Sequence, residues 1–134
     1  MIHNPYHIPG LYSSSIILQL ERANRGVLEI TRDNILNECI SIMNEKNKTN
    51  YNKEDAISKC RVTELVEIRH MAAYHLRNIL DMQWKSIGRY LGNRDHSTAI
   101  NSHRQWSDWS EQKYNKQIHK ANERLLNAFG LNKN

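Results

Sequence analysis

The sequence predicts an all-α protein, and three observations support this fold class. Residues 63–80 place apolar side chains at the spacing of one helix face, and neither Gly nor Pro interrupts them. Residues 84–106 have the pattern of a helix-turn-helix, with a short helix, a turn and a longer helix. No stretch alternates apolar and polar residues with the two-residue period of a half-buried strand.

Length, charge and cysteine content narrow the class further. The 134 residues suffice for one domain with an apolar core, and the formal net charge of +5 favours a polyanionic partner. The two cysteines, Cys39 and Cys60, lack CxxC spacing, which disfavours a disulfide framework or a zinc ribbon and fits a reducing compartment. The N-terminus lacks the pattern of a signal peptide or a membrane span, so we expect a cytoplasmic protein.

The N-terminal part is predicted to be an arm followed by helices. Pro5, Pro9 and Gly10 mark an extended or turning arm, and residues 14–24 can form a short helix. We expect Asp33 to cap the next helix, in which four apolar residues repeat at helical spacing. These four are Ile35, Cys39, Ile42 and Met43.

The middle of the chain is predicted to hold a loop, a short helix and a long helix. The polar stretch NKTNYNK indicates the loop, and KEDAISKC indicates a short helix that ends near Cys60. The long helix covers residues 63–80. Its apolar stripe consists of Leu65, Ile68, Met71, Ala72, Leu76, Ile79 and Leu80.

The helix-turn-helix follows directly. Its first helix is two turns long, and Trp84, Ile87 and Leu91 share one face of it. Gly92 can take the left-handed conformation that ends a helix, and Asp95 can cap the next one. The second helix continues its buried side with Ala99, Ile100 and Trp106.

The C-terminal residues 108–129 are predicted to form one polar helix with a weak apolar stripe. The stripe consists of Tyr114, Ile118, Leu125 and Leu126, and we expect it to pack on its own domain rather than on a partner. Four aromatic residues before and at this helix fall on apolar faces: Trp84, Tyr90, Trp106 and Trp109. We expect these rings to belong to the core rather than to a stacking platform for single strands.

The polar cluster of residues 94–98 raises the question of catalysis or metal binding. Side chains of Asp95 and His96, adjacent on a helix, point about 100° apart and do not meet as a base and its orienting acid. No nucleophile motif and no GxxxxGK[ST] loop occurs. His96 and His103 are seven residues apart, without the i, i+4 pairing of helical zinc ligands. We therefore expect no enzyme, no metal and no cofactor.

Two readings of the cluster remain. Asp95 can be a helix cap alone, with Arg94 and His96 solvated like most surface charges. The cluster also occupies the first turn of the second helix, where helix-turn-helix proteins place side chains against base edges in the major groove. The predominance of basic residues over acidic ones between Arg61 and Arg104 favours this second reading.

The residues then match a known family. The stretch IGRYLGNRDHSTAINS, residues 87–102, resembles the signature of the DNA-binding domain of DnaA, the bacterial replication initiator. SKCRVTELVEIRHMAAYHL resembles the basic loop and long helix of that domain, and RDNILNECISIM is similar more loosely. The likeness covers residues 31–115. It implies a Trp-repressor-like helix-turn-helix bundle at residues 31–134, a stand-alone domain without the ATPase domain, preceded by the arm of residues 1–30.

The resemblance also implies roles for individual residues. Arg61 corresponds to the loop arginine that enters the minor groove, although the same residue could be solvated or could cap the preceding helix. Arg69, expected in the first turn of the long helix, corresponds to a phosphate contact, and His70 beside it joins the DNA-binding set. Asp95, His96 and Ser97, followed by Thr98, correspond to the base-reading triplet. Lys85, Arg94 and Arg104 are implied to contact phosphates or groove edges.

Several positions depart from the family pattern. Ser97 stands in place of the more usual Thr and lacks a methyl group that can pack on thymine. Glu67 and Ile68 replace an Arg-Pro pair, which removes a positive charge. Ala99 stands where Val is usual, and Gln105 where a basic residue is frequent. These changes put the exact base preference and the number of phosphate contacts in doubt.

Together these features predict a nucleoid-associated protein that binds double-stranded DNA at a DnaA-box-like site. We expect a monomer on DNA, acting as a regulator of replication or transcription. The alternative is a protein-interaction adaptor that retains the fold without specific DNA binding. Its protein partner would dock on residues 1–30, which include the aromatic stretch NPYHIPGLY.

Overall fold

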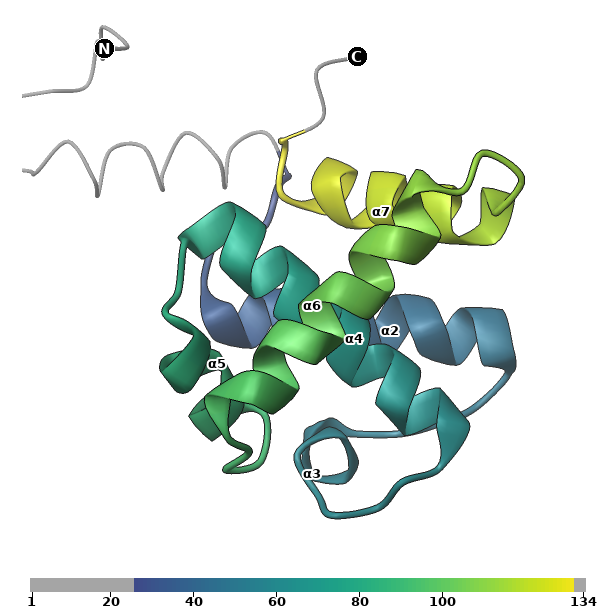
Figure 1. The fold of residues 1–134 in the computed structure, drawn as a ribbon. Coiled ribbons are helices and arrows are strands. Elements are labelled where there is room, and N and C mark those ends of the chain that lie inside the picture. Colours follow the sequence, from purple (N-terminus) through teal and green to yellow (C-terminus); the bar gives the residue numbers. More distant parts are fainter. Residues whose placement is uncertain (1–25, 132–134) are drawn as a thin grey trace, which may run out of the picture.

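A computed structural model of the chain describes residues 26–131 and confirms the all-α class (Figure 1). Six helices and no strand occur among these residues. The helices are α2 (Arg32–Asn47), α3 (Lys53–Ala56), α4 (Thr63–Leu80), α5 (Trp84–Tyr90), α6 (His96–Glu111) and α7 (Lys116–Ala128). The predicted arm and the predicted helix of residues 14–24 lie outside the described residues.

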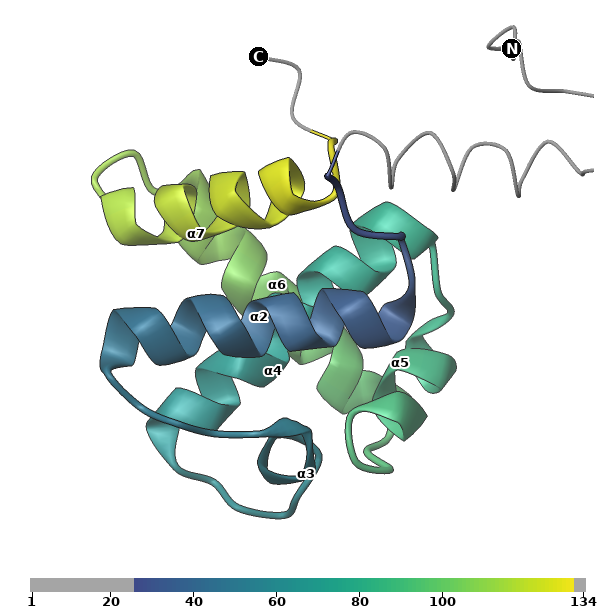
Figure 2. The ribbon, with the colours of Figure 1, turned by 180° about the vertical axis from the view of Figure 1, so that it is seen from behind.

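Helix α4 lies at the centre of the domain, with α2 on one side and α6 crossing it on the other (Figures 1 and 2). Its bounds, Thr63–Leu80, confirm the predicted helix. The middle of the apolar stripe is buried completely, since Ile68, Met71 and Leu76 have no exposed surface. Because the stripe contacts both neighbouring helices, α4 supplies the core that holds α2 and α6 in place.

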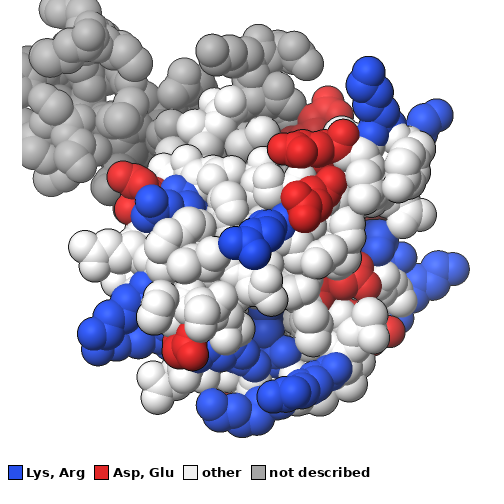
Figure 3. All heavy atoms as spheres, viewed as in Figure 1, with Lys and Arg blue, Asp and Glu red and all other residues white. Residues whose placement is uncertain are grey.

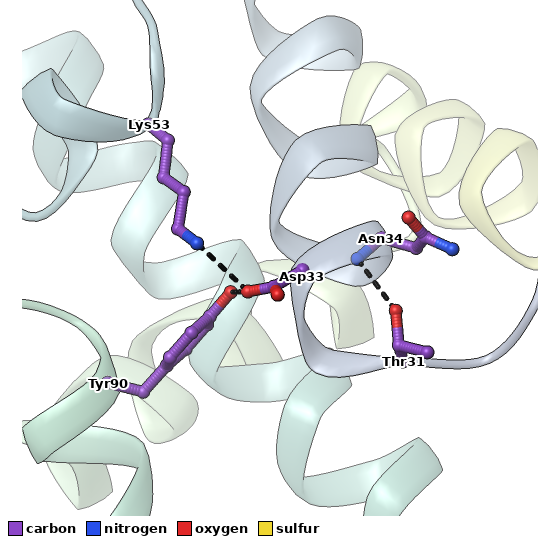
Figure 4. A network of polar contacts seen from close by, with 5 residues as sticks. All are labelled: Thr31, Asp33, Asn34, Lys53 and Tyr90. Carbon is purple, nitrogen blue, oxygen red and sulfur yellow. Dashed lines mark hydrogen bonds and ion pairs between the residues drawn. The ribbon is translucent and has the colours of Figure 1, made fainter.

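The start of α2 differs from the prediction. Thr31 is the N-cap, and its hydroxyl oxygen accepts a hydrogen bond from the backbone N–H of Asn34 at 3.1 Å. Asp33 instead lies in the first turn and accepts hydrogen bonds from the Tyr90 hydroxyl and, at 2.9 Å, from Lys53 Nζ (Figure 4). These two donors, Tyr90 first, lower the pKa of the exposed Asp33 carboxyl. The side chain therefore joins α2 to α3 and α5.

Helix α3 is shorter than predicted, because it ends at Ala56 and not near Cys60. A capping box between Asn52 and Asp55 fixes its start. At its end the Ser58 hydroxyl donates to the carbonyl of Asp55 at 2.6 Å, which competes with continued helical bonding. Arg69 Nε donates a hydrogen bond to the carbonyl oxygen of Ala56 at 2.7 Å. Residues 57–62 therefore form an irregular connection, named here the α3–α4 connection.

The C-terminal part also differs from the prediction, since two helices replace one. Helix α6 continues to Glu111, and α7 begins only at Lys116 after a turn. Helix α7 folds back on the domain and buries Ile118 and Leu125, as expected of its apolar stripe. Tyr114 lies in the turn and is 80% exposed, so it does not belong to the buried face.

The polar side chain of Asn122 joins α7 to α4 and α6. Asn122 Oδ1 accepts from Trp106 Nε1 at 2.8 Å and lies 2.9 Å from His75 Nε2. Asn122 Nδ2 donates to the Ser110 hydroxyl at 2.9 Å. Burial lowers the pKa of His75 to about 4, so the imidazole is neutral near pH 7.

The predictions for the aromatic residues of the core are confirmed, whereas Ile100, expected on the buried side of α6, is only partly buried and lies outside the core. Trp106 is fully buried, and Trp84, Tyr90 and Trp109 are partly buried against the core. Both cysteines are free, with Cys39 buried and Cys60 exposed. Among residues 26–131, no helix has the length and apolar character required to cross a membrane.

Replacing Asn122 by Ala should lower the free energy of unfolding by about 1–3 kcal/mol, because the buried N–H of Trp106 would lose its acceptor. Asn127→Ala, at an exposed position of the same helix, should change it by less than about 0.5 kcal/mol. Urea unfolding followed by circular dichroism measures both. Equal effects of the two substitutions would contradict the assigned role of Asn122.

Candidate nucleic-acid interface

The helix-turn-helix consists of α5, a turn and α6, and two glycines allow its close packing. Gly92 has a φ of +100°, which confirms that it ends α5 in a conformation that other residues rarely adopt. A Cβ atom on Gly88 would lie 2.3 Å from the carbonyl oxygen of Arg94. Only glycine therefore lets α5 approach the residues that lead into α6.

Asp95 caps α6 as predicted. Its Oδ1 atom accepts from the backbone N–H groups of Ser97, at 2.7 Å, and Thr98, at 3.2 Å. The same oxygen accepts from the Ser97 hydroxyl at 2.5 Å. These bonds, the Ser97 hydroxyl first, lower the pKa of the Asp95 carboxyl, so it is ionised at neutral pH. The cap fixes the orientation of the first turn.

The first turn of α6 presents its side chains to solvent. Asp95, His96, Ser97 and Thr98 are all exposed, while the following Ala99 is buried in the core. One turn later, Asn101 is also exposed and lines a shallow hollow with Ser97, Thr98, Ile100 and Arg104. The sequence analysis overlooked Asn101, although its position four residues after Ser97 places it on the same helix face.

The α3–α4 connection lies beside this turn and carries exposed cations. Lys59 and Arg61 are exposed, and Lys59 Nζ lies 3.5 Å from the carbonyl oxygen of Gly92. Arg61 is close enough to Arg94 for its charge to contribute to lowering the pKa of that guanidinium. The structure therefore brings the connection, which lies more than thirty residues earlier, next to the start of α6.

Three further exposed cations come from the helix-turn-helix itself, Lys85 and Arg89 from α5 and Arg104 from α6. Figure 3 shows Lys and Arg side chains gathered on the lower part of the molecule. In Figure 1 this is the side on which α3, α5 and the beginning of α6 lie. A basic surface thus surrounds the exposed turn of residues 95–98.

Arg69 does not belong to this exposed surface, and its expected position in the first helical turn was wrong. It lies in the second turn of α4 and is only 4% exposed. Its guanidinium donates to carbonyl oxygens of the α3 end, including Ala56 at 2.7 Å and Ser58 at 2.9 Å. Burial, and then the charge of Arg94, lower its pKa. These bonds direct the guanidinium to protein carbonyls, and this arrangement does not support the implied phosphate contact.

Arg94 is half-buried and is also bound to carbonyls. Its Nη2 atom donates to Ser58 O at 2.7 Å, and its Nη1 atom donates to Leu91 O. Burial is the main cause of its lowered pKa. The guanidinium therefore joins the turn between α5 and α6 to the α3–α4 connection. This arrangement does not support the implied phosphate contact.

His70 is separated from the other predicted residues. Its ring packs against Trp109, near the opposite end of α6, with 5.6 Å between the ring centroids. Burial lowers the pKa of His70, and its buried Nδ1 atom has no hydrogen-bond partner. The side chain packs in the contact between α4 and α6, and this position does not support the predicted DNA contact.

His103 is partly buried and contacts side chains of α4 and α5. It lies 3.0 Å from Asn78 Oδ1, and its ring is 5.1 Å from the rings of Tyr74 and Trp84. In the part of the chain that the structure describes, no group of three or more His, Cys, Asp or Glu residues could hold a metal ion.

Comparisons with known proteins agree with this geometry. A family model described as the bacterial dnaA protein helix-turn-helix matches residues 46–105. The chromosomal replication initiator protein DnaA of Spiroplasma citri is 39% identical over 46 residues, which are 34% of this chain and 10% of that protein. The protein of the same name from Bacteroides thetaiotaomicron is 36% identical over 45 residues, with the same coverage of both chains.

The match is confined to one part of each chain. The chain spans about a tenth of the length of these curated relatives, and no solved structure matches it significantly. The matched segment runs from the end of α2 through most of α6 and contains the α3–α4 connection, the buried Arg69 and the turn of residues 91–95. Residues 46–105 are therefore similar to the family of bacterial DnaA helix-turn-helix domains.

Proposed function

We propose that this protein binds double-stranded DNA sequence-specifically at a DnaA-box-like site and regulates replication or transcription. The observation that carries the proposal is the exposed polar turn of residues 95–98 at the start of α6, bordered by exposed cations from the α3–α4 connection. In helix-turn-helix proteins the start of the second helix reads base edges in the major groove. The names of the matching relatives, replication initiators, agree with this class of activity.

The hydrogen bonds within the turn define what it can offer to bases. All the hydrogen bonds described for the Asp95 carboxylate fall on Oδ1, and Oδ2 is the atom that would accept from a cytosine amino group. Ser97 donates its hydroxyl hydrogen to Asp95, which leaves its oxygen lone pairs as an acceptor for an adenine or cytosine amino group. Thr98 carries a methyl group that can pack on the methyl of thymine.

Arg61 would read the adjacent minor groove. It is exposed on the α3–α4 connection beside the start of α6, and no ion pair to a carboxylate is found for it among the described residues. A guanidinium on such a connection can enter a narrow A/T-rich minor groove, where the negative potential is strongest. Lys59, Lys85 and Arg104, exposed around the same turn, would contact phosphates and supply much of the salt-dependent affinity.

One chain would bind one asymmetric site. Residues 26–131 contain a single helix-turn-helix, and the apolar face of α7 is already buried against its own domain. A two-fold symmetric site would need a second recognition helix from a partner. Sedimentation of a saturated complex with a single-site duplex should therefore give one chain per duplex.

Fluorescence anisotropy with a DnaA-box duplex and a scrambled duplex tests the proposal. We expect tighter binding of the box, and a steep loss of affinity on both duplexes as the salt concentration rises, because counterions compete for the phosphates. Binding of neither duplex, or no difference between them, would instead support the adaptor alternative.

Replacing His96 by Ala should reduce the preference for the box by about 1–3 kcal/mol and leave affinity for the scrambled duplex nearly unchanged. His96 is exposed in the first turn of α6, so the substitution removes a base contact and no packing. His119→Ala, an exposed histidine on α7, is the control and should bind as the wild type does. The same loss on both duplexes for His96→Ala would contradict base reading.

Replacing Arg61 by Ala should weaken binding more when the flank of the site is A/T-rich than when it is G/C-rich, because guanine places an amino group in the minor groove. Lys59→Ala, in the same connection, should lower affinity on both flanks equally and reduce the salt slope by about one. Equilibrium titrations with the two flanks distinguish these patterns. A uniform loss for Arg61→Ala would reassign Arg61 to a phosphate.

A further inference from the structure

We propose that Arg69 and Arg94 position the minor-groove arginine, Arg61, relative to the recognition helix α6 by sharing the carbonyl oxygen of Ser58. The inference rests on the proposed function, since it assigns to these two cations a role in reading both grooves together. They act through Arg61 and α6 and are positioning residues that need not touch DNA.

The shared carbonyl joins three separate parts of the domain. Ser58 O accepts from Arg69 Nη2 at 2.9 Å and from Arg94 Nη2 at 2.7 Å. Arg69 is rooted in α4 and is also bonded to Ala56 O, whereas Arg94 is rooted in the helix-turn-helix turn and is also bonded to Leu91 O. The oxygen atom therefore connects the α3–α4 connection to the central helix and to the turn before α6.

The backbone around the shared carbonyl is in direct contact with the turn. A Cβ atom on Gly92 would lie 2.2 Å from Ile57 O, so only a glycine admits this approach. Lys59 follows Ser58 in the sequence, and its Nζ atom lies 3.5 Å from Gly92 O. The connection is thus held against the turn over three consecutive residues.

Fixing Ser58 restricts Arg61, which follows three residues later on an irregular segment. Three residues of extended chain span at most about 10 Å, so the backbone of Arg61 stays close to the anchored carbonyl. The helical hydrogen bonds at the end of α3 stop at Ser58, so they do not hold the residues from Lys59 to Arg61. The distance between the minor-groove side chain and the start of α6 would then vary, and the two could not engage adjacent grooves in a fixed register.

Placing the three arginines Arg61, Arg69 and Arg94 close together has an electrostatic cost, and the hydrogen bonds of Arg69 and Arg94 offset it. Arg69, Arg94 and Arg61 are neighbours, and no ion pair to a carboxylate is found for any of them within residues 26–131. Partial burial and the neighbouring positive charges lower the pKa values of Arg69 and Arg94. Charged donors bound to carbonyl oxygens stabilise such an arrangement, and the planar fork of Arg can serve two carbonyls where a Lys ammonium cannot.

The substitution Arg94→Lys distinguishes a positioning role from phosphate binding. It keeps the positive charge but removes the planar guanidinium that can donate to two carbonyls. Binding is measured on three duplexes that differ only in the minor-groove flank: A·T pairs, inosine·C pairs, which lack the minor-groove amino group, and G·C pairs. The wild type should prefer the first two over the third by about tenfold. In Arg94→Lys the ratio of the affinity for the A·T or inosine·C duplex to the affinity for the G·C duplex should fall to about one. The dependence of affinity on salt concentration should stay at the wild-type value.

Arg77→Lys is the matched control. Arg77 Nη1 donates to Met82 O at 2.8 Å and its guanidinium lies over the Trp84 ring, so the substitution removes the same kind of bond away from the connection. It should keep the flank ratio of the wild type. An unchanged ratio in Arg94→Lys would overturn the proposal, and so would an equal fall in both variants, which would indicate a general loss of structure.

A measurement without DNA tests the anchor independently. A nitroxide attached to the exposed Cys60 reports the mobility of the connection, and the buried Cys39, whose pKa burial raises, stays unlabelled. Mobility should increase in Arg94→Lys and stay at the wild-type level in Arg77→Lys. An unchanged spectrum in Arg94→Lys would overturn the positioning role whatever the DNA result. A changed spectrum in a protein that does not distinguish the box from the scrambled duplex would contradict the proposed function and leave the anchor standing.

Discussion

The packing of α4 between α2 and α6 is the constraint on which the rest of the structure depends. Its apolar residues contact both neighbours, so the burial of one helix fixes the directions of the other two. Helix α6 buries Ala99, Ser102 and Trp106 on the side that faces the core. The first turn of α6 is then exposed, because it extends past the core at the side where α5 joins it.

Polar side chains complete the arrangement where the apolar core ends. Asn122 joins α7 to α4 and α6, Asp33 joins α2 to α5, and the carbonyl of Ser58 joins α3 and its connection to α4 and the turn. Asp33 and the Ser58 carbonyl lie at a helix start and on a connection, whereas Asn122 lies in the middle of α7; at all three places backbone or buried polar groups need partners. The apolar core sets the positions of the helices, and these hydrogen bonds set the positions of the segments between them.

The cations of residues 58–104 divide into two groups by their surroundings. Arg69, Arg77 and Arg94 donate to protein carbonyls, whereas the others are exposed: Lys59, Arg61, Lys85, Arg89 and Arg104. The first group holds segments of the domain together, and the second contributes positive charge to the surface. A count of basic residues in the sequence cannot separate these contributions, since it gives each cation the same weight.

The sequence by itself determined the features that depend on neighbours within a few residues. The period of its apolar residues located α4, Gly92 and Asp95 marked the turn, and the residues of that turn indicated the resemblance to the helix-turn-helix family that matches residues 46–105. Only the tertiary structure decided where side chains with distant partners lie. Asp33 proved to bind Tyr90, 57 residues away, instead of capping α2, and Arg69 turned to carbonyls 11 to 14 residues before it. Helix periodicity and caps are local properties of the chain, whereas the partner of a long polar side chain depends on which segments the core brings together.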